Sequence, residues 1–296
     1  MTGFLTGTAT AMVTPFTESG VDFNAFSRMI EYQITGGTDT LVILGTTGEP
    51  ATMSALEREE VMRFAKKTIG SRARIVFGSG SNSTQNTVEA SKRAESLGAD
   101  GLLVVTPYYN KCTQDGIVRH YEAVCSAVQI PVICYNVPAR TGVNILPATM
   151  QRLAEIPNMA GIKEACGNME QICETMRRIR GKCDMYSGDD NLNLPILAIG
   201  GTALISVVSN LVPKEVKAMY EAFAAGDLVR ANALQDALLP LIDACFTEVN
   251  PIPAKAGMRM LGLDAGIPRL PLTELSEPHK QVMRDALAEL GYAVKA

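Results

Sequence analysis

Lys163 is the residue of this sequence best placed for covalent chemistry. It follows the apolar and small residues Met-Ala-Gly-Ile at 159–162, which predict a strand that ends at this lysine. An amine held at a strand end, with little water around it, can lose its proton near neutral pH and attack a carbonyl carbon to form a Schiff base. The plainer interpretation is a surface lysine that extends from the strand end into solvent.

Two further polar segments follow apolar runs that have the length of strands. Residues 135–142 read Tyr-Asn-Val-Pro-Ala-Arg-Thr-Gly and follow the run 131–134, and residues 45–49 read Gly-Thr-Thr-Gly-Glu and follow the run 41–44. In a parallel α/β barrel, the carboxyl ends of the strands are where catalytic groups gather. Three polar sets in such positions favour a catalytic interpretation of Lys163.

An apolar strand-like run followed by an amphipathic helical stretch repeats along the chain. The predicted strands are 8–16, 40–44, 74–78, 101–106, 131–134, 159–163, 184–188 and 203–208. The clearest helix is 54–69, where Ser54 can cap the N-terminus and Glu57 completes a capping box. Alternating strands and helices indicate a parallel sheet, and eight repeats indicate an α/β fold closed into a (β/α)8 TIM barrel. An open doubly wound sheet is the alternative, but it favours a glycine-rich dinucleotide loop, which residues 10–16 lack.

The repeat ends near Gly226, and the pattern after it is helical. Three helical stretches follow with no strand between them: 227–249, 253–261 and 277–290. We therefore expect a barrel domain at 1–226, which carries the active site, and a small C-terminal helical domain at 227–296. The length of 296 residues fits one barrel of roughly 250 residues with a small addition.

Composition restricts the classes of function. Lys and Arg total 27 against 31 Asp and Glu, for a net charge of -4, so the chain lacks the basic excess that nucleic-acid binding requires. With only His120 and His279, there is little material for a histidine metal site or a Ser-His-Asp triad, and proton transfer must use tyrosine, lysine or a carboxylate. Seven cysteines without a Cys-x-x-Cys spacing, no signal-like start and no apolar run of membrane-spanning length indicate a cytoplasmic protein with reduced thiols and no membrane partner.

The chain resembles a known family over essentially its whole length. The blocks 45–49, 108–110 (Tyr-Tyr-Asn), 135–142 and 161–164 (Gly-Ile-Lys-Glu) stand in the order and spacing of the pyruvate-dependent Schiff-base aldolases and lyases, and among these the chain resembles the dihydrodipicolinate synthase family. The resemblance implies a barrel with a C-terminal helical domain. It also implies condensation of pyruvate with L-aspartate 4-semialdehyde to (2S,4S)-4-hydroxy-2,3,4,5-tetrahydrodipicolinate, in lysine and diaminopimelate biosynthesis, by a homotetramer built as a dimer of dimers.

Four residues are candidates for the catalytic steps. Lys163 would attack C2 of pyruvate, and the protonated imine withdraws electrons, so no metal or bound cofactor is needed for that step. With histidine scarce, Tyr135 is the best-placed proton shuttle, but an isolated tyrosine, with a pKa of about 10, is a weak base at pH 7. The hydroxyls of Thr46 and Tyr109 can complete a relay with it, because each both donates and accepts. The resemblance implies that Tyr109 is lent to the site of a neighbouring subunit.

Four other residues are candidates for substrate binding. Thr47, together with N–H groups of the glycine-bearing turn around it, is suited to bind the carboxylate of pyruvate. Arg140 can hold the carboxylate of aspartate semialdehyde by two parallel hydrogen bonds. The resemblance implies that the backbone carbonyl of Ile205 also faces pyruvate and that Gly188 lies close to the imine.

Two alternative functions stay open on the sequence. An N-acetylneuraminate lyase or 2-keto-3-deoxy sugar-acid aldolase would share Lys163 and Tyr135, but it has no need of Arg140 at this position. A non-catalytic relative would keep the barrel and bind a keto acid as a sensor or scaffold. The presence of Thr46 and Tyr109 beside Lys163 and Tyr135 argues against that second alternative.

The sequence departs from lysine-regulated members of the family at two places of the lysine cleft. Tyr108, Ala51 and Asn82 are compatible with such a cleft, but Asn86 stands where an acidic residue is expected, and Arg58 lies in a stretch that often carries histidines. A buried lysine ammonium needs a compensating negative charge. We therefore expect that lysine inhibits this protein weakly or not at all.

Overall fold

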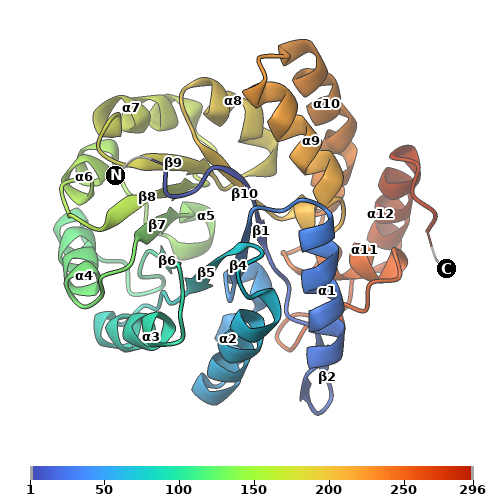
Figure 1. Ribbon diagram of the computed structural model, residues 1–296, viewed down its shortest axis with the longest axis horizontal. Coiled ribbons are helices and arrows are strands. Elements are labelled where there is room, and N and C mark those ends of the chain that lie inside the picture. Colours follow the sequence, from blue (N-terminus) through green and yellow to red (C-terminus); the bar gives the residue numbers. More distant parts are fainter. Residues whose placement is uncertain (1–2, 295–296) are drawn as a thin grey trace. The chain divides into compact units, whose positions relative to one another are not determined.

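Eight strands form a closed barrel in the computed structural model, which describes residues 3–294 (Figure 1). Around the barrel the strands follow the order β1-β10-β9-β8-β7-β6-β5-β4. Their bounds are β1 Gly7–Ala11, β4 Thr40–Ile43, β5 Arg74–Gly78, β6 Gly101–Val105, β7 Val132–Asn136, β8 Met159–Glu164, β9 Asp184–Ser187 and β10 Ala203–Ser206. The predicted (β/α)8 TIM barrel followed by helices is confirmed.

The first predicted strand, 8–16, is wrong in its second half. β1 ends at Ala11, and the chain then forms a short antiparallel hairpin from β2, Phe16–Thr17, and β3, Gly20–Val21. Pro15 stands between these elements and has no N–H to donate to a strand partner, which disfavours one continuous strand through it.

Helices follow the barrel strands, as the repeat predicts. The α-helices are α1 Phe23–Thr35, α2 Ala55–Ile69, α3 Thr84–Ser96, α4 Gln114–Ser126, α5 Pro138–Thr141, α6 Pro147–Leu153, α7 Met169–Ile179, α8 Asn193–Ala198, α9 Pro213–Ala224, α10 Leu228–Ala244, α11 Ile252–Met260 and α12 Glu277–Glu289. Four short 3-10 helices complete the secondary structure of the described residues: η1 Thr46–Gly48, η2 Pro50–Thr52, η3 Asp190–Leu192 and η4 Val208–Asn210.

The three helical stretches expected near the C-terminus are present as α10, α11 and α12. The first was expected to run to residue 249, but α10 ends at Ala244. The β-branched Thr247 and Val249 form helix poorly, and Asn250 precedes a proline, which disfavours helical backbone. The boundary between a barrel domain and a helical domain at residue 226 stays a prediction.

Close packing divides the chain into two units. The first contains Ile75–Ile205 with the N-terminal segment up to Thr6, and the second contains Gly7–Arg74 with the segment from Ser206 onward. In the first unit, α3, α4, α6 and α7 lie outside the strands (Figure 1). The buried residues of α4, α6 and α7 are mostly apolar, whereas α3 buries the small residues Thr87, Ser91 and Ala94. In the second unit, α9 packs against β1 and α10, and α12 packs against α10 and α11.

Gly161 allows β8 to lie close to its neighbour β9. A Cβ atom at this position would lie 2.5 Å from the carbonyl oxygen of Asp184 and 2.9 Å from the ring of Tyr186, so any larger residue would force the strands apart. Every residue of β8 is buried. The register then pairs Lys163 of β8 with Tyr135 of β7 on one side and with Tyr186 of β9 on the other.

The predicted capping box at the start of α2 is confirmed. The hydroxyl of Ser54 accepts a hydrogen bond from the N–H of Glu57 at 3.1 Å, and the carboxylate of Glu57 accepts one from the N–H of Ser54 at 2.9 Å. Two donors at the helix start are thereby satisfied reciprocally.

We expect Ser54→Ala to lower the free energy of unfolding by about 1 kcal/mol, because the N–H of Glu57 loses its acceptor. Urea unfolding at constant slope measures this loss. Ser19→Ala removes an exposed hydroxyl outside any helix and should change stability by less than about 0.5 kcal/mol. Equal effects from the two substitutions would contradict the capping role.

Candidate active site

The amine of Lys163 is buried against an aromatic ring. Only 4% of the lysine is exposed, and its Nζ lies 4.4 Å from the centroid of the Tyr135 ring. Both residues are near the carboxyl ends of their strands and are register partners across β7 and β8. The structure therefore brings together the two residues that were expected to carry the covalent step and the proton transfer.

Burial determines the protonation of Lys163. Its pKa is lowered to about 8, mainly because burial removes the amine from water; the carboxylate of Asp190 opposes this shift, and the charge of Arg140 adds to it. An amine with this pKa is neutral in about a tenth of the molecules at pH 7. Lys163 can therefore act as a nucleophile near neutral pH. A solvated surface lysine, the plainer interpretation, would remain protonated at this pH.

Gly188 leaves the space that the lysine side chain occupies. It directly follows β9 and donates its N–H to the carbonyl oxygen of Glu164 at 2.8 Å. A Cβ atom at this position would lie 2.9 Å from both Cγ and Cε of Lys163. Gly188 thus lies against the side chain of Lys163, in a close approach that only glycine permits, and its place beside the imine stays a prediction. Ile205, the other residue expected near pyruvate, is buried in β10.

A buried amide network anchors the loop that carries Arg140. Asn136, the last residue of β7, donates through Nδ2 to Oε1 of Glu164 at 3.0 Å and to Oδ1 of Asn144 at 2.9 Å. Asn144 in turn donates to Oε1 of Gln171 on α7 at 2.7 Å. Burial raises the pKa of Glu164 to about 7, although the hydrogen bonds that it accepts oppose this shift. Arg140 itself is exposed, on the short helix α5 between the two asparagines.

Tyr109 does not join Lys163 within the chain. It is 89% exposed, and its backbone has a left-handed conformation with a φ of 72°. Such a conformation is uncommon for a tyrosine, and so is an almost fully exposed aromatic side chain. Its expected role in a proton relay with Tyr135 stays a prediction that requires a second subunit.

The second unit contains Thr46, which was predicted for the proton relay, and Thr47, which was predicted to bind the carboxylate of pyruvate. Thr46 and Thr47 form the start of η1, which Leu44 and Gly45 separate from the end of β4, and Thr46 is partly exposed whereas Thr47 is buried. The hydroxyl of Thr14 donates to the carbonyl oxygen of Gly48 at 2.8 Å and fixes the turn from one side. Glu49 ends the turn in a left-handed conformation with a φ of 56°. A non-glycine residue in this conformation needs support from its surroundings.

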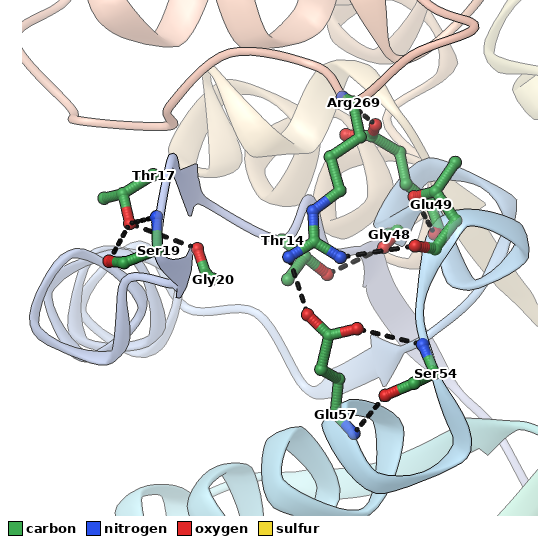
Figure 2. Close-up of polar contacts among 10 residues, drawn as sticks. Thr14, Thr17, Ser19, Gly20, Gly48, Glu49, Ser54, Glu57 and Arg269 are labelled. Atoms are coloured by element: carbon green, nitrogen blue, oxygen red, sulfur yellow. Dashed lines mark hydrogen bonds and ion pairs between the residues drawn. The ribbon is translucent and has the colours of Figure 1, made fainter.

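That support comes from buried charges on the C-terminal helical segment. Lys255 of α11 forms an ion pair with Glu49 at 2.5 Å, and both side chains are almost fully buried. The backbone N–H of Arg269 donates to the second oxygen of Glu49 at 3.0 Å, and its guanidinium reaches Glu57 at 2.6 Å (Figure 2). Both cations also face the ring of Phe16, with Nζ of Lys255 at 4.5 Å and Cζ of Arg269 at 4.1 Å from its centroid.

Comparisons with known proteins give the family. The family model described as "Dihydrodipicolinate synthetase family" matches residues 4–290. The chain belongs to the dihydrodipicolinate synthetase family. It is 46% identical over 290 residues to the 4-hydroxy-tetrahydrodipicolinate synthase of Caldicellulosiruptor bescii, covering 98% of each chain.

Two solved structures show the same relationship in three dimensions. The dihydrodipicolinate synthase of Aquifex aeolicus is 40% identical and superposes with a TM-score of 0.96, covering 99% of this chain and 100% of that one. The chloride-inhibited enzyme of Acinetobacter baumannii, solved in complex with pyruvate, is also 40% identical, with a TM-score of 0.94 and coverage of 97% and 99%. The fold of this chain therefore matches that of both synthases over nearly all of its length.

The sequence analysis missed Asp190, Asn250 and Lys255 in this family member. Asp190 belongs to an acidic pair at the end of the predicted strand 184–188, and its place after a strand was an available signal. Asn250, which hydrogen-bonds Thr47, and Lys255 lie in a segment that reads only as helical packing. No local pattern marks them, because their partners are about 200 positions earlier in the chain.

Three further findings concern the described residues. No group of three or more His, Cys, Asp or Glu side chains within residues 3–294 is arranged to hold a metal ion. No helix in the same range is long and apolar enough to cross a membrane. The cysteines are thiols rather than disulfides, as their number and spacing predict.

The two charges near Lys163 should shift its pKa in opposite directions. We expect Asp190→Asn to lower the pKa of Lys163 below about 8, because the ammonium form loses a favourable carboxylate. Arg140→Ala should raise it, because a repelling cation is removed. The measurement is the pH dependence of acylation of Lys163 by a small reagent, followed by mass spectrometry of its peptide.

The exposed Lys92 on α3 is the internal control and should be acylated alike in all three proteins. Shifts in the same direction for both variants, or an apparent pKa of Lys163 near the ordinary lysine value, would show that its environment is described wrongly.

Proposed function

We propose that this protein condenses pyruvate with L-aspartate 4-semialdehyde to give (2S,4S)-4-hydroxy-2,3,4,5-tetrahydrodipicolinate, in lysine and diaminopimelate biosynthesis. The single observation that carries the proposal is the buried amine of Lys163, with a pKa lowered to about 8, at the end of a barrel strand in a member of this family. Relatives that match nearly the full chain are named for this activity, which supports the proposed substrates.

The covalent steps follow from the chemistry of an imine. The neutral amine of Lys163 adds to C2 of pyruvate, and loss of water leaves a protonated imine. This cation withdraws electrons, so a proton leaves the methyl carbon and an enamine forms. The enamine carbon attacks the aldehyde of aspartate semialdehyde. The amino group of that substrate then displaces Lys163 from C2 and closes the ring, so the lysine is regenerated and one water is released overall.

Proton transfer in these steps is assigned to Tyr135. Its ring lies against the amine of Lys163, and the two residues are register partners on the neighbouring strands β7 and β8. Thr46 and Tyr109 would complete the relay, because hydroxyls both donate and accept protons. The outward position of Tyr109 supports the proposal that it enters the site of a neighbouring subunit in a homotetramer built as a dimer of dimers.

Substrate carboxylates are assigned to two different groups. The hydroxyl of Thr47 and the N–H groups of its turn would bind the carboxylate of pyruvate, with the carbonyl of Ile205 and the space at Gly188 on the side of the imine. Arg140, exposed on a loop that the Asn136 network anchors, would hold the carboxylate of aspartate semialdehyde by two parallel hydrogen bonds. This second role favours the condensation over cleavage of a sugar acid.

The proposal includes a cytoplasmic location and chemistry that needs no added cofactor. The seven cysteines are thiols, which supports the cytoplasmic location. The imine supplies its own electron sink, which supports chemistry without an added cofactor.

Reduction with borohydride in the presence of pyruvate tests the proposed function. We expect the protein to gain the mass of one reduced pyruvate adduct, located on the peptide that contains Lys163, and to form product when aspartate semialdehyde is added. Lys163→Met keeps much of the buried volume and removes the amine, so it should abolish both adduct and activity, at least about 10³-fold in rate.

Thermal unfolding of Lys163→Met is the control for an intact fold. An undiminished adduct in that variant would remove Lys163 from the mechanism. An adduct in the native protein without turnover of aspartate semialdehyde would favour a binding protein, and turnover of a sugar acid instead would favour the aldolase alternative.

The structure adds a reason to expect weak inhibition by lysine. Asn86 is an exposed, uncharged residue in the first turn of α3. Glu57 directly precedes Arg58, but its carboxylate is bound by Arg269 and by the N–H of Ser54, which together lower its pKa to about 2. Glu57 is thus already paired and offers little attraction to a second cation.

We expect lysine at 1 mM to change the initial rate by less than about a quarter, because no unpaired carboxylate is provided at either position. Initial rates across a lysine titration measure this. Asn86→Glu restores a negative charge and should increase inhibition, whereas Gln85→Glu, one position away on the same helix, is the matched control. Strong saturable inhibition of the native protein would overturn the assignment.

A further inference from the structure

Asn250 contacts the residue that is proposed to bind the substrate carboxylate. Its Nδ2 donates to the hydroxyl oxygen of Thr47 at 2.9 Å, across 203 positions of sequence. Asn250 is 5% exposed and Thr47 is 2% exposed, so neither side chain can exchange this partner freely for bulk water. The contact is therefore a fixed part of the second unit.

The direction of this hydrogen bond constrains the hydroxyl proton of Thr47. An amide NH2 group only donates, so the hydroxyl must accept from it. A hydroxyl carries a single proton, and that proton cannot point toward the donor that it faces. Thr47 therefore holds its proton away from Asn250, available to an acceptor elsewhere.

We infer that Asn250 is a positioning residue, which aims the hydroxyl proton of Thr47 at the carboxylate of pyruvate. The inference rests on the proposed function, because that function gives Thr47 its acceptor. Without Asn250, the hydroxyl is free to rotate, and substrate binding must then fix its orientation. This cost falls on the affinity for pyruvate and not on the later chemical steps.

The surrounding contacts explain how Asn250 keeps its place. It lies two residues before α11, and that helix carries Lys255, which is paired with Glu49 at the end of the same turn. The carbonyl of Gly48 is bound by Thr14 at 2.8 Å. The start of α11 and the residues just before it thus contact the turn at both Thr47 and Glu49, which holds the amide donor beside the hydroxyl.

Asn250→Leu tests the inference, because the leucine side chain has the same number of non-hydrogen atoms as asparagine and no hydrogen-bond donor. We expect the KM for pyruvate to rise about tenfold while kcat changes by less than about twofold, since the affected contact is equally present before and during the chemical steps. Thr47→Val should raise the KM at least as much. The double variant should match Thr47→Val alone, because the proposed effect of Asn250 on pyruvate binding passes through the Thr47 hydroxyl. In a Thr47→Ser background, which keeps a hydroxyl, the effect of Asn250→Leu should persist.

A structural control separates positioning from loss of stability. Asn158→Ala removes amide hydrogen bonds to the carbonyls of Cys125 and Val128 and should lower the thermal midpoint without changing the KM for pyruvate. Asn250→Ala serves as a second variant if the leucine does not fit the site.

The outcomes distinguish this inference from the proposed function. Absence of a pyruvate adduct on Lys163 in the native protein would remove the proposed function itself. Three results, each alongside a normal adduct in the native protein, would overturn the role of Asn250 alone. They are an unchanged KM for pyruvate in Asn250→Leu, effects of the two substitutions that multiply in the double variant, and a fall in kcat as large as the rise in KM. Failure of both Asn250 variants to fold would assign the residue to stability and overturn it as well.

Discussion

The exclusion of water from the amine of Lys163 is the constraint on which the rest of the site depends. A lysine in solvent keeps its proton at neutral pH and cannot attack a carbonyl. Here the side chain lies against Tyr135 and fills the space that Gly188 leaves open, and burial brings its pKa to about 8. Asp190 and Arg140 adjust that value in opposite directions. Burial alone would lower the pKa of Lys163 further and disfavour its ammonium form. The carboxylate of Asp190 limits this effect, so the amine can still be protonated during turnover.

Strand alternation separates this reactive face from a structural one. Lys163 and Glu164 are consecutive residues of β8, so their side chains leave the strand on opposite sides. The lysine meets the ring of Tyr135, whereas the glutamate accepts hydrogen bonds from Asn136 in the network that anchors the loop of Arg140. One strand therefore positions the nucleophile and also supports the loop proposed to hold the second substrate. The cost is a buried carboxyl group whose pKa is raised to about 7.

The second unit uses a different device to shape a turn. Glu49 has a backbone conformation that is unfavourable for most residues, and it is stabilised by a buried ion pair with Lys255 and by the N–H of Arg269. Removing two charges from water is costly, and such pairs add little to stability on their own. Their benefit here is geometric, because the pair fixes the turn that contains Thr47. The helical segment after the barrel thus contributes to the proposed substrate site rather than only to the bulk of the protein.

The sequence by itself determined the barrel and the main candidates, because these depend on local patterns. Apolar runs of strand length repeat at regular intervals, and Lys163 and Tyr135 stand at the ends of two of them. The capping box of α2 was also predictable, since it involves residues only three positions apart. The break after Ala11 was missed because an apolar run does not reveal where pairing stops. Only the tertiary structure decided the partners of Thr47 and Glu49, because those contacts join segments about 200 residues apart. Burial, and with it the lowered pKa of Lys163, is likewise a property of the packed chain.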